Sequence, residues 1–242
     1  MNINVKESFI EKFGKYFGEE TDLPIAFWYG NDPLQEEEIR PKNWMCIIGQ
    51  LNRIRKGESL SFSADSVSCG GGKTYCGFSE FMPGLADFLS TGKERYLQNP
   101  EIAQKVINQF PVYNAPAKYI SFKRWDQLLE EDEPEVVIFF AKPDVLSGLF
   151  TLSNYDQSEL QSTIVPFSSG CGSIITFPYQ ESQKENPKAI LGMFDVSARL
   201  YVPANTLSLA IPMKKMLDMI ANMDESFLAT DEWTKVKNRI SR

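Results

Sequence analysis

Hydrophobic residues follow two different patterns along the chain. In residues 4–17 they recur every three or four positions, which predicts an amphipathic helix. Residues 25–29 and 135–141 are short, largely apolar runs that end at turn residues, and such runs predict buried strands. The second run is the clearest strand signal in the chain, and it is followed by Pro143-Asp144.

These patterns predict one mixed α/β (α+β) domain spanning residues 1–242, in which helices flank a central mixed sheet. Apolar strands must be covered on at least one face, so the helices pack against the sheet. We expect central strands at residues 25–29, 60–63, 136–140, 163–167 and 190–195, and a further strand near 119–122. Helices are expected at residues 43–55 with Asn43 as cap, 78–89 with an interruption near Pro83-Gly84, 100–108, 145–152, 212–220 and 224–240.

The order of these elements suggests an internal duplication. A strand, a helix, a second strand and a Cys-Gly pair occur in residues 20–110 and again in residues 115–205, and the C-terminal helices 212–240 follow. Cys69-Gly70 and Cys171-Gly172 would then occupy equivalent places and face one another across a pseudo-twofold axis. The alternative is chance, because many α/β chains show strand–helix–strand order.

Composition limits the function classes. The chain has 242 residues, of which 43% are hydrophobic, so it can bury a substantial core. Its net charge of -7 argues against binding to nucleic acid or to anionic membranes, which attract clustered Lys and Arg. Histidine is absent, which excludes Ser-His-Asp and Cys-His catalysis and the usual zinc hydrolase sites. Any general base must therefore be Asp, Glu, Lys, Tyr or a thiolate.

The ends and apolar runs of the chain give an expectation about its location. The N-terminus has no apolar signal core, and no apolar run is long enough to span a membrane. We therefore expect a cytoplasmic protein, in which the four cysteines are thiols and not disulfides. The sequence leaves the oligomeric state open, and a homo-oligomer is one of the states it allows.

A segment of thiols and glycines is the strongest sign of a functional site. Residues 68–78 read SCGGGKTYCGF, and residues 169–172 read SGCG. Glycine leaves room for a ligand and reaches backbone angles closed to other residues, so a Cys-Gly turn can present a thiolate and bare amides together. The candidate ligand- or metal-binding residues are Cys46, Cys69, Cys76 and Cys171. The candidate anion-binding residues are Gly70, Gly71, Gly72, Lys73 and Gly172, whose amides could form a nest.

Neither motif identifies its ligand. Gly72-Lys73-Thr74 matches the end of a phosphate-binding loop, but Val67 stands where that motif requires glycine, so an NTPase is not expected. The thiols form no C-x-x-C pair, which is the strongest local sign of a zinc or iron–sulfur site. Thiolates in a less regular arrangement would select zinc, copper(I) or an iron–sulfur cluster. For Cys46 and Cys76 the alternative is burial as small core residues.

Three functional hypotheses follow. The leading hypothesis is a protein that binds a metal, an iron–sulfur cluster or a small ligand at Cys69 and Cys171, with Cys46 as a further ligand. The second is an enzyme with Cys69 as nucleophile, in which Lys73 or the glycine amides lower the thiol pKa and Asp65 transfers protons. The third is a structural or interaction protein, which predicts buried, inert thiols and an apolar surface patch.

The same segments carry a resemblance to a known family. They are Trp44-Met45-Cys46, the SCGGG run, Gly77-Phe78, residues 135–137 with Lys142-Pro143-Asp144, residues 169–172 and Ile211-Pro212-Met213. In this order they resemble the uncharacterised ArCR family, domain of unknown function 169, over nearly the whole chain. Cys46, Cys69 and Cys171 match positions where that family tends to have cysteine. Ile174 and Ile175 replace an arginine that some members carry. The resemblance supports the fold and its boundaries, and it implies no established activity.

Overall fold

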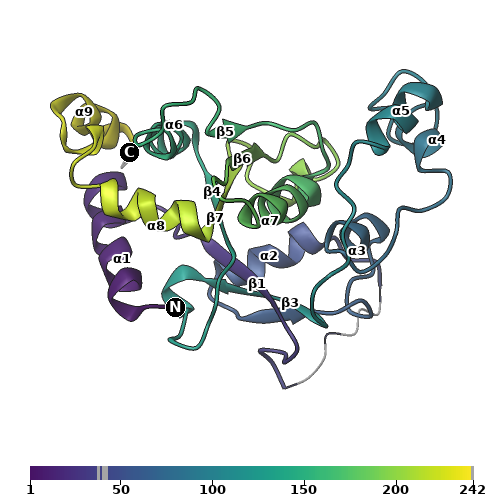
Figure 1. Cartoon of the computed structure of the whole chain (residues 1–242), viewed down its shortest axis with the longest axis horizontal. Helices are drawn as coiled ribbons and strands as arrows, with labels where there is room; N and C mark the ends of the chain where they lie inside the picture. Colours follow the sequence, from purple (N-terminus) through teal and green to yellow (C-terminus); the bar gives the residue numbers. More distant parts are fainter. Residues whose placement is uncertain (37–38, 40–42, 241–242) are drawn as a thin grey trace.

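A mixed β-sheet runs through the middle of the molecule (Figure 1). A computed structural model of the chain describes residues 1–36, 39 and 43–240. In this part of the chain, one seven-stranded sheet has the order β2-β3-β1-β4-β7-β6-β5. The strands are β1 (Ile25–Gly30), β2 (Leu60–Phe62), β3 (Tyr119–Arg124), β4 (Val136–Ala141), β5 (Thr163–Ile164), β6 (Ala189–Gly192) and β7 (Leu207–Pro212).

The pairing of the strands confirms the predicted mixed sheet. Neighbouring strands are antiparallel, except that β5 and β6 are parallel. At the centre, β4 pairs with β7 from Val136 opposite Pro212 to Ala141 opposite Leu207. All residues of β4 are buried, because this strand lies between β1 and β7 and has helices on both faces.

Helices cover both faces of the sheet. Because successive strand residues point to opposite faces, Val137 and Phe139 pack on one helical layer, whereas Ile138 and Phe140 pack on the other. The first layer contains α1 (Ile3–Phe17), α6 (Pro143–Ser153), α8 (Met213–Asn222) and α9 (Asp231–Ile240). The second layer contains α2 (Ile47–Arg55), α3 (Gly70–Tyr75), the π-helix η2 (Gly172–Thr176) and α7 (Phe177–Ser182). The described part of the chain also has three short 3₁₀ helices: η1 (Trp125–Gln127), η3 (Arg199–Tyr201) and η4 (Phe227–Ala229).

Two further helices, α4 (Leu85–Leu89) and α5 (Pro100–Ile107), stand apart at one end of the molecule (Figure 1). Asn99 caps α5, because its side chain accepts a hydrogen bond from the Ile102 amide, and Pro100 suits the first helical turn. α4 begins after Gly84, whose φ of 77° is a left-handed angle that glycine adopts without strain. We call residues 81–110 the α4–α5 lobe.

Several predicted boundaries are wrong. The helix predicted from residue 43 begins at Ile47, and Cys46 is its N-cap residue in place of Asn43. The helix predicted over residues 78–89 is confined to Leu85–Leu89. The strand predicted at 163–167 ends at Ile164, since Pro166 has no amide hydrogen for a ladder bond. The strand predicted at 190–195 is Ala189–Gly192, and it ends where Met193 takes a left-handed conformation.

The central strand β7 is missing from the predicted sheet. Its apolar run directly precedes α8, and the prediction placed Pro212 in the first turn of that helix. In the structure Pro212 is the last residue of β7 and the N-cap residue of α8. The chain passes from strand to helix without a loop, so no turn residue marks the boundary.

The proposed duplication equates α2 with α6. These helices cover opposite faces of the sheet. A twofold axis between the antiparallel neighbours β1 and β4 would instead keep equivalent helices on the same face. The arrangement therefore lends no support to a pseudo-twofold axis, and the duplication stays a prediction.

Candidate functional site

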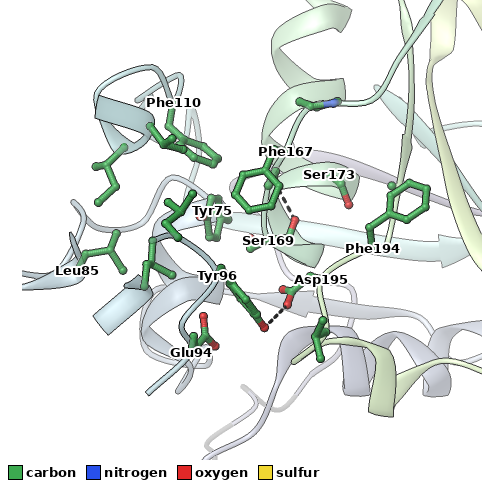
Figure 2. A pocket seen from close by; sticks show the side chains of 18 of the residues that line it. Tyr75, Leu85, Glu94, Tyr96, Phe110, Phe167, Ser169, Ser173, Phe194 and Asp195 are labelled. Carbon is green, nitrogen blue, oxygen red and sulfur yellow. Dashed lines mark hydrogen bonds between the residues drawn. The ribbon is translucent and has the colours of Figure 1, made fainter. Parts of the chain in front are cut away.

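A cavity of about 300 Å³ lies between the α4–α5 lobe and the segments that follow β5 and β6 (Figure 2). Most of its lining is apolar. The apolar residues are Tyr75, Phe81, Leu85, Leu89, Leu97, Val106, Ile107 and Phe110 on the side of the lobe, and Val165, Pro166, Phe167, Met193, Phe194 and Val196 on the side of the sheet. The polar residues include Glu94, Tyr96, Ser168, Ser169, Ser173 and Asp195.

Aromatic rings join the α4–α5 lobe to the rest of the molecule. Tyr75, at the end of α3, meets Phe81 and Phe110 edge to face, with 5.9 Å between ring centroids in each pair. The ring centroid of Phe110 also lies 5.7 Å from that of Phe177 in α7. Aromatic pairs at such distances are favourable beyond the area they bury. The wall of the cavity that the lobe provides is therefore held against α3 and α7.

The opposite wall rests on the helix that carries Cys171. Residues 170–182 form one continuous helix whose middle is the π-helical segment η2. The Phe177 amide donates to the Gly172 carbonyl, five residues earlier, and Pro178, which has no amide hydrogen, follows directly. Such π-helical insertions are frequent at functional sites. Here the insertion carries Ser173, whose side chain lies at the cavity (Figure 2).

Ser173 holds the loop after β6 in an unusual backbone conformation. Its hydroxyl donates to the Gly170 carbonyl at 2.8 Å and accepts from the Met193 amide at 3.2 Å. Met193 is buried and has a φ of 67°, a left-handed angle that costs a non-glycine residue about 1–3 kcal/mol. A Cβ on Gly192 would lie 2.4 Å from the Ser173 Cβ, so only glycine fits there. The surrounding structure thus imposes this strained turn on the cavity wall.

Asp195 is the centre of the polar end of the cavity (Figure 2). Its Oδ1 accepts hydrogen bonds from the Tyr96 hydroxyl at 3.0 Å and from the Ser197 amide and hydroxyl, both at 2.9 Å. Its Oδ2 accepts a hydrogen bond from the Gly170 amide at 2.8 Å. These donors fix the carboxylate between the α4–α5 lobe, the helix that carries Cys171 and the loop after β6.

A second carboxylate, that of Glu94, lies at the same end of the cavity (Figure 2). Burial raises the pKa of Glu94 and the charge of Asp195 raises it further, while the Ser197 hydroxyl and Lys93 have smaller lowering effects. Burial also raises the pKa of Tyr75 to about 12, so its hydroxyl is protonated at neutral pH. Among the described residues that line the cavity, every charged side chain is acidic.

The SCGGG run forms the start of a helix and not the predicted turn. Cys69 is the N-cap residue of α3, and residues 70–72 are its first turn. The Gly72 amide donates to the Cys69 sulfur at 3.5 Å. The Gly172 amide likewise donates to the Ser169 hydroxyl at 3.1 Å. These two glycine amides, predicted to bind an anion, are thus engaged in hydrogen bonds inside the protein.

The two cysteine segments meet through Tyr75. The Thr176 hydroxyl donates to the Tyr75 carbonyl at 2.8 Å, and a Cβ on Gly172 would lie 3.2 Å from the Tyr75 ring. The strands that precede these segments, β2 and β5, do not lie side by side, because they are the two edge strands of the sheet. The segments meet in the helical layer above the sheet instead.

The four cysteines are free thiols in neighbouring parts of the second layer. Burial raises the pKa of Cys171 well above its usual range, and the nearby thiols of Cys46, Cys76 and Cys69 raise it further. Burial also raises the pKa of Cys46 and that of Cys76. The buried thiols are therefore protonated at neutral pH. In the part of the chain that the structure describes, no group of three or more Cys, Asp or Glu is arranged to hold a metal ion.

The match to known protein families agrees with the arrangement of these segments along the chain. The profile of one family matches residues 22–222, which is most of the chain. The chain belongs to the uncharacterised ArCR family. This assignment confirms the resemblance that the cysteine segments carry. No curated protein and no solved structure matches the chain significantly. Membership of the ArCR family assigns no activity, so only the chemistry of the site can indicate a function.

Sequence reasoning missed the cavity of this ArCR protein. Most of its lining comes from the α4–α5 lobe and from two loops, and the two cysteine–glycine motifs contribute only Tyr75 and Ser169. Phe167 and Phe194 were predicted to lie in the central strands 163–167 and 190–195, but both follow the ends of β5 and β6 and line the cavity. Phe167, Phe194 and Val196 are 64%, 54% and 69% exposed at the cavity. Exposed apolar residues that gather in one place mark binding sites.

The length and composition of the described helices bear on membrane insertion. None of them, in residues 1–36, 39 and 43–240, combines the length and the apolar character needed to cross a membrane.

Proposed function

We propose that this ArCR protein binds a small, largely apolar molecule in the cavity between the α4–α5 lobe and the loops after β5 and β6. One observation carries the proposal: a cavity of about 300 Å³ has an aromatic and aliphatic lining with a few polar groups at one end. Ligand sites in proteins have this composition and start at about this size. The polar groups would orient the ligand, and the apolar lining would supply most of the binding free energy.

The rigidity of the cavity wall also supports binding. Met193 is held in a strained conformation by Ser173, and Asp195 is fixed by four hydrogen bonds. A wall that is already ordered loses little conformational entropy when a ligand arrives. Strained residues held by their surroundings are also common at binding sites.

The cysteines support this wall in the proposed function. Gly170, whose amide binds Asp195, directly precedes Cys171, and Tyr75 connects the Cys69 segment to the cavity. In the part of the chain that the structure describes, no three Cys, Asp or Glu side chains are arranged to hold a metal ion. We therefore place the ligand in the cavity and not between the thiols.

The two alternative hypotheses differ in their support. Cys69 does not line the cavity, so an enzyme with Cys69 as nucleophile would need a different substrate site. An interaction protein is the second candidate, because Phe167 and Phe194 are exposed at the cavity and the Cys76 and Cys171 side chains are buried. A partner chain would cover these two rings, whereas a small ligand would enter between them and the lobe.

Fluorescence titration with the neutral, apolar dye N-phenylnaphthylamine tests the proposal. We expect saturable binding at one site. Val106→Trp places a large ring in the cavity and should weaken binding at least about tenfold. Gln104→Trp, on an exposed position of the same helix, is the matched control and should leave binding unchanged.

Equal dye binding by the wild type and Val106→Trp would contradict the proposal. If, in addition, the protein self-associates and Phe167→Ser abolishes the association, the interaction hypothesis is the better one. Sedimentation at several protein concentrations gives that second measurement.

A further inference from the structure

The charged side chains that line the cavity are all negative. Glu94 and Asp195 line it, and no lysine or arginine is among the described residues of its lining. The basic residue that affects Glu94 is its chain neighbour Lys93, whose side chain is exposed. An apolar wall with two carboxylates at one end has a negative potential that water screens poorly in a partly enclosed space.

The two carboxylates have different roles. Asp195 accepts hydrogen bonds from Tyr96, Ser197 and Gly170, and these occupy both of its oxygens. It therefore contributes charge and holds the wall together. The Ser197 hydroxyl also lies near Glu94, but it donates its single proton to Asp195. An ionised carboxylate has about four acceptor sites, so Glu94 retains acceptor capacity for a ligand.

From these observations we infer that the ligand carries an organic ammonium group joined to an apolar body. The ammonium lies beside Glu94, and the body lies among the aromatic and aliphatic side chains of the cavity. This inference rests on the proposed function, because it assumes that the cavity holds a small molecule.

A cationic ligand suits the two carboxylates better than an anionic or a neutral ligand does. A carboxylate or phosphate ligand would place a third negative charge next to Glu94 and Asp195. A neutral ligand would bury the ionised Glu94 without a charged partner, which is costly. An ammonium group supplies the missing charge and up to three donors.

Aromatic rings at the same end of the cavity suit a cation as well. Figure 2 shows Tyr96 beside Asp195 and Glu94, with Tyr75 above it in this view. The face of a tyrosine ring attracts an ammonium group within about 6 Å. Phe81 and Phe110, which pack on Tyr75, extend the apolar surface away from the charged end.

Three probes with the same apolar body test the inference: phenylpropylamine, phenylpropanol and phenylpropanoate. Calorimetric titrations at about pH 8 keep the amine protonated and Glu94 ionised. We expect the amine to bind at least about tenfold more tightly than the alcohol, and the carboxylate to bind most weakly. Glu94→Gln should remove most of the advantage of the amine and should not weaken binding of the alcohol, because the alcohol no longer buries an ionised carboxylate. Glu101→Gln, an exposed position on α5 with the same change of charge, should alter neither affinity.

The outcomes separate the inference from the proposed function. If the alcohol binds as tightly as the amine, or if Glu94→Gln weakens both equally, the ammonium inference is overturned and the cavity remains a ligand site. If N-phenylnaphthylamine binds and is blocked by Val106→Trp while the amine does not bind, the inference again fails alone. If neither the dye nor any of the three probes binds, both proposals fail.

Discussion

The Asp195 carboxylate accepts a hydrogen bond from the Gly170 amide at 2.8 Å. This contact joins the loop after β6 to the start of the helix that contains Cys171. The cysteine–glycine motif therefore contributes to the cavity through its backbone, although its thiol is buried elsewhere in the core. A motif that suggests thiol chemistry in the sequence can thus act by positioning a carboxylate.

Asp195→Asn should destabilise the protein by about 2 kcal/mol, although the side chain keeps its shape. One oxygen becomes an NH₂ donor that faces a donor of Tyr96, Ser197 or Gly170, so partly buried and exposed hydrogen bonds to a charged group are lost. Urea unfolding at neutral pH measures the change. Asp218→Asn, at an exposed position of α8, removes the same charge and should change the free energy of unfolding by less than about 0.5 kcal/mol. Equal stability of the two variants would show that the Asp195 contacts contribute nothing.

Gly192→Ala should be more damaging than its size suggests, at about 2 kcal/mol or more. The new methyl group would lie 2.4 Å from the Ser173 Cβ, and neither backbone can move without disturbing the Met193 turn. Thermal unfolding followed by circular dichroism measures the effect. Gly30→Ala is the control, because a Cβ there meets nothing within 4 Å. If both alanine variants unfold at the same temperature, the Ser173 contact is not as tight as we describe.

The hydrophobic pattern predicts most of the helices and strands, because the burial of apolar residues decides both where such residues occur in the sequence and how the chain folds. β4 is apolar at every position and lies at the centre of the sheet with helices on both faces. The order of the strands in the sheet could not be predicted in this way, because it depends on pairing between residues that are distant in the sequence. Nothing local shows that β7 inserts between β4 and β6, or that β2 and β5 become the two edges.

The candidate site is less predictable for a related reason. Cys69 and Cys171 stand out in the sequence because cysteine and glycine are distinctive residue types. The cavity depends on Tyr75, Phe110 and Asp195, which are ordinary residue types, and only Tyr75 lies within a cysteine–glycine motif. Their roles come from tertiary contacts between the lobe, the π-helical segment and the loop after β6. Such contacts leave no spacing that a single sequence can show.

Because of Asp224, the free energy of unfolding of the protein should decrease as the pH falls into the acid range. The Lys12 side chain, the Tyr16 hydroxyl and Lys15 donate to this carboxylate and lower its pKa in the folded state. A carboxyl whose pKa is lower when folded stabilises the protein above its unfolded pKa of about 4, and this contribution is lost as the pH falls below that value. Because Asp224 is 44% exposed, solvent screening limits the effect to about 1 kcal/mol.

The measurement for Asp224 is the free energy of unfolding of the wild type and Asp224→Asn between about pH 2 and pH 7. The two curves should differ at neutral pH and converge in acid. A constant difference across the whole range would mean that the substitution acts through packing and not through the charge.

Cys171 and Cys76 should resist alkylation in the native protein, whereas Cys69 should react first. Burial raises the pKa of both buried thiols, so their thiolate fractions are small, and the sulfurs lie inside the second layer. Cys69, at the start of α3, is half-buried and can be reached by a reagent. Iodoacetamide at about pH 7.5, with the labelled peptides identified by mass spectrometry, gives the rate at each position. In denaturant all four thiols should react at similar rates, which controls for peptide recovery. If Cys171 reacted in the native protein as fast as Cys69, the second layer would have to open readily, and a role for the thiols in metal binding or catalysis would regain support.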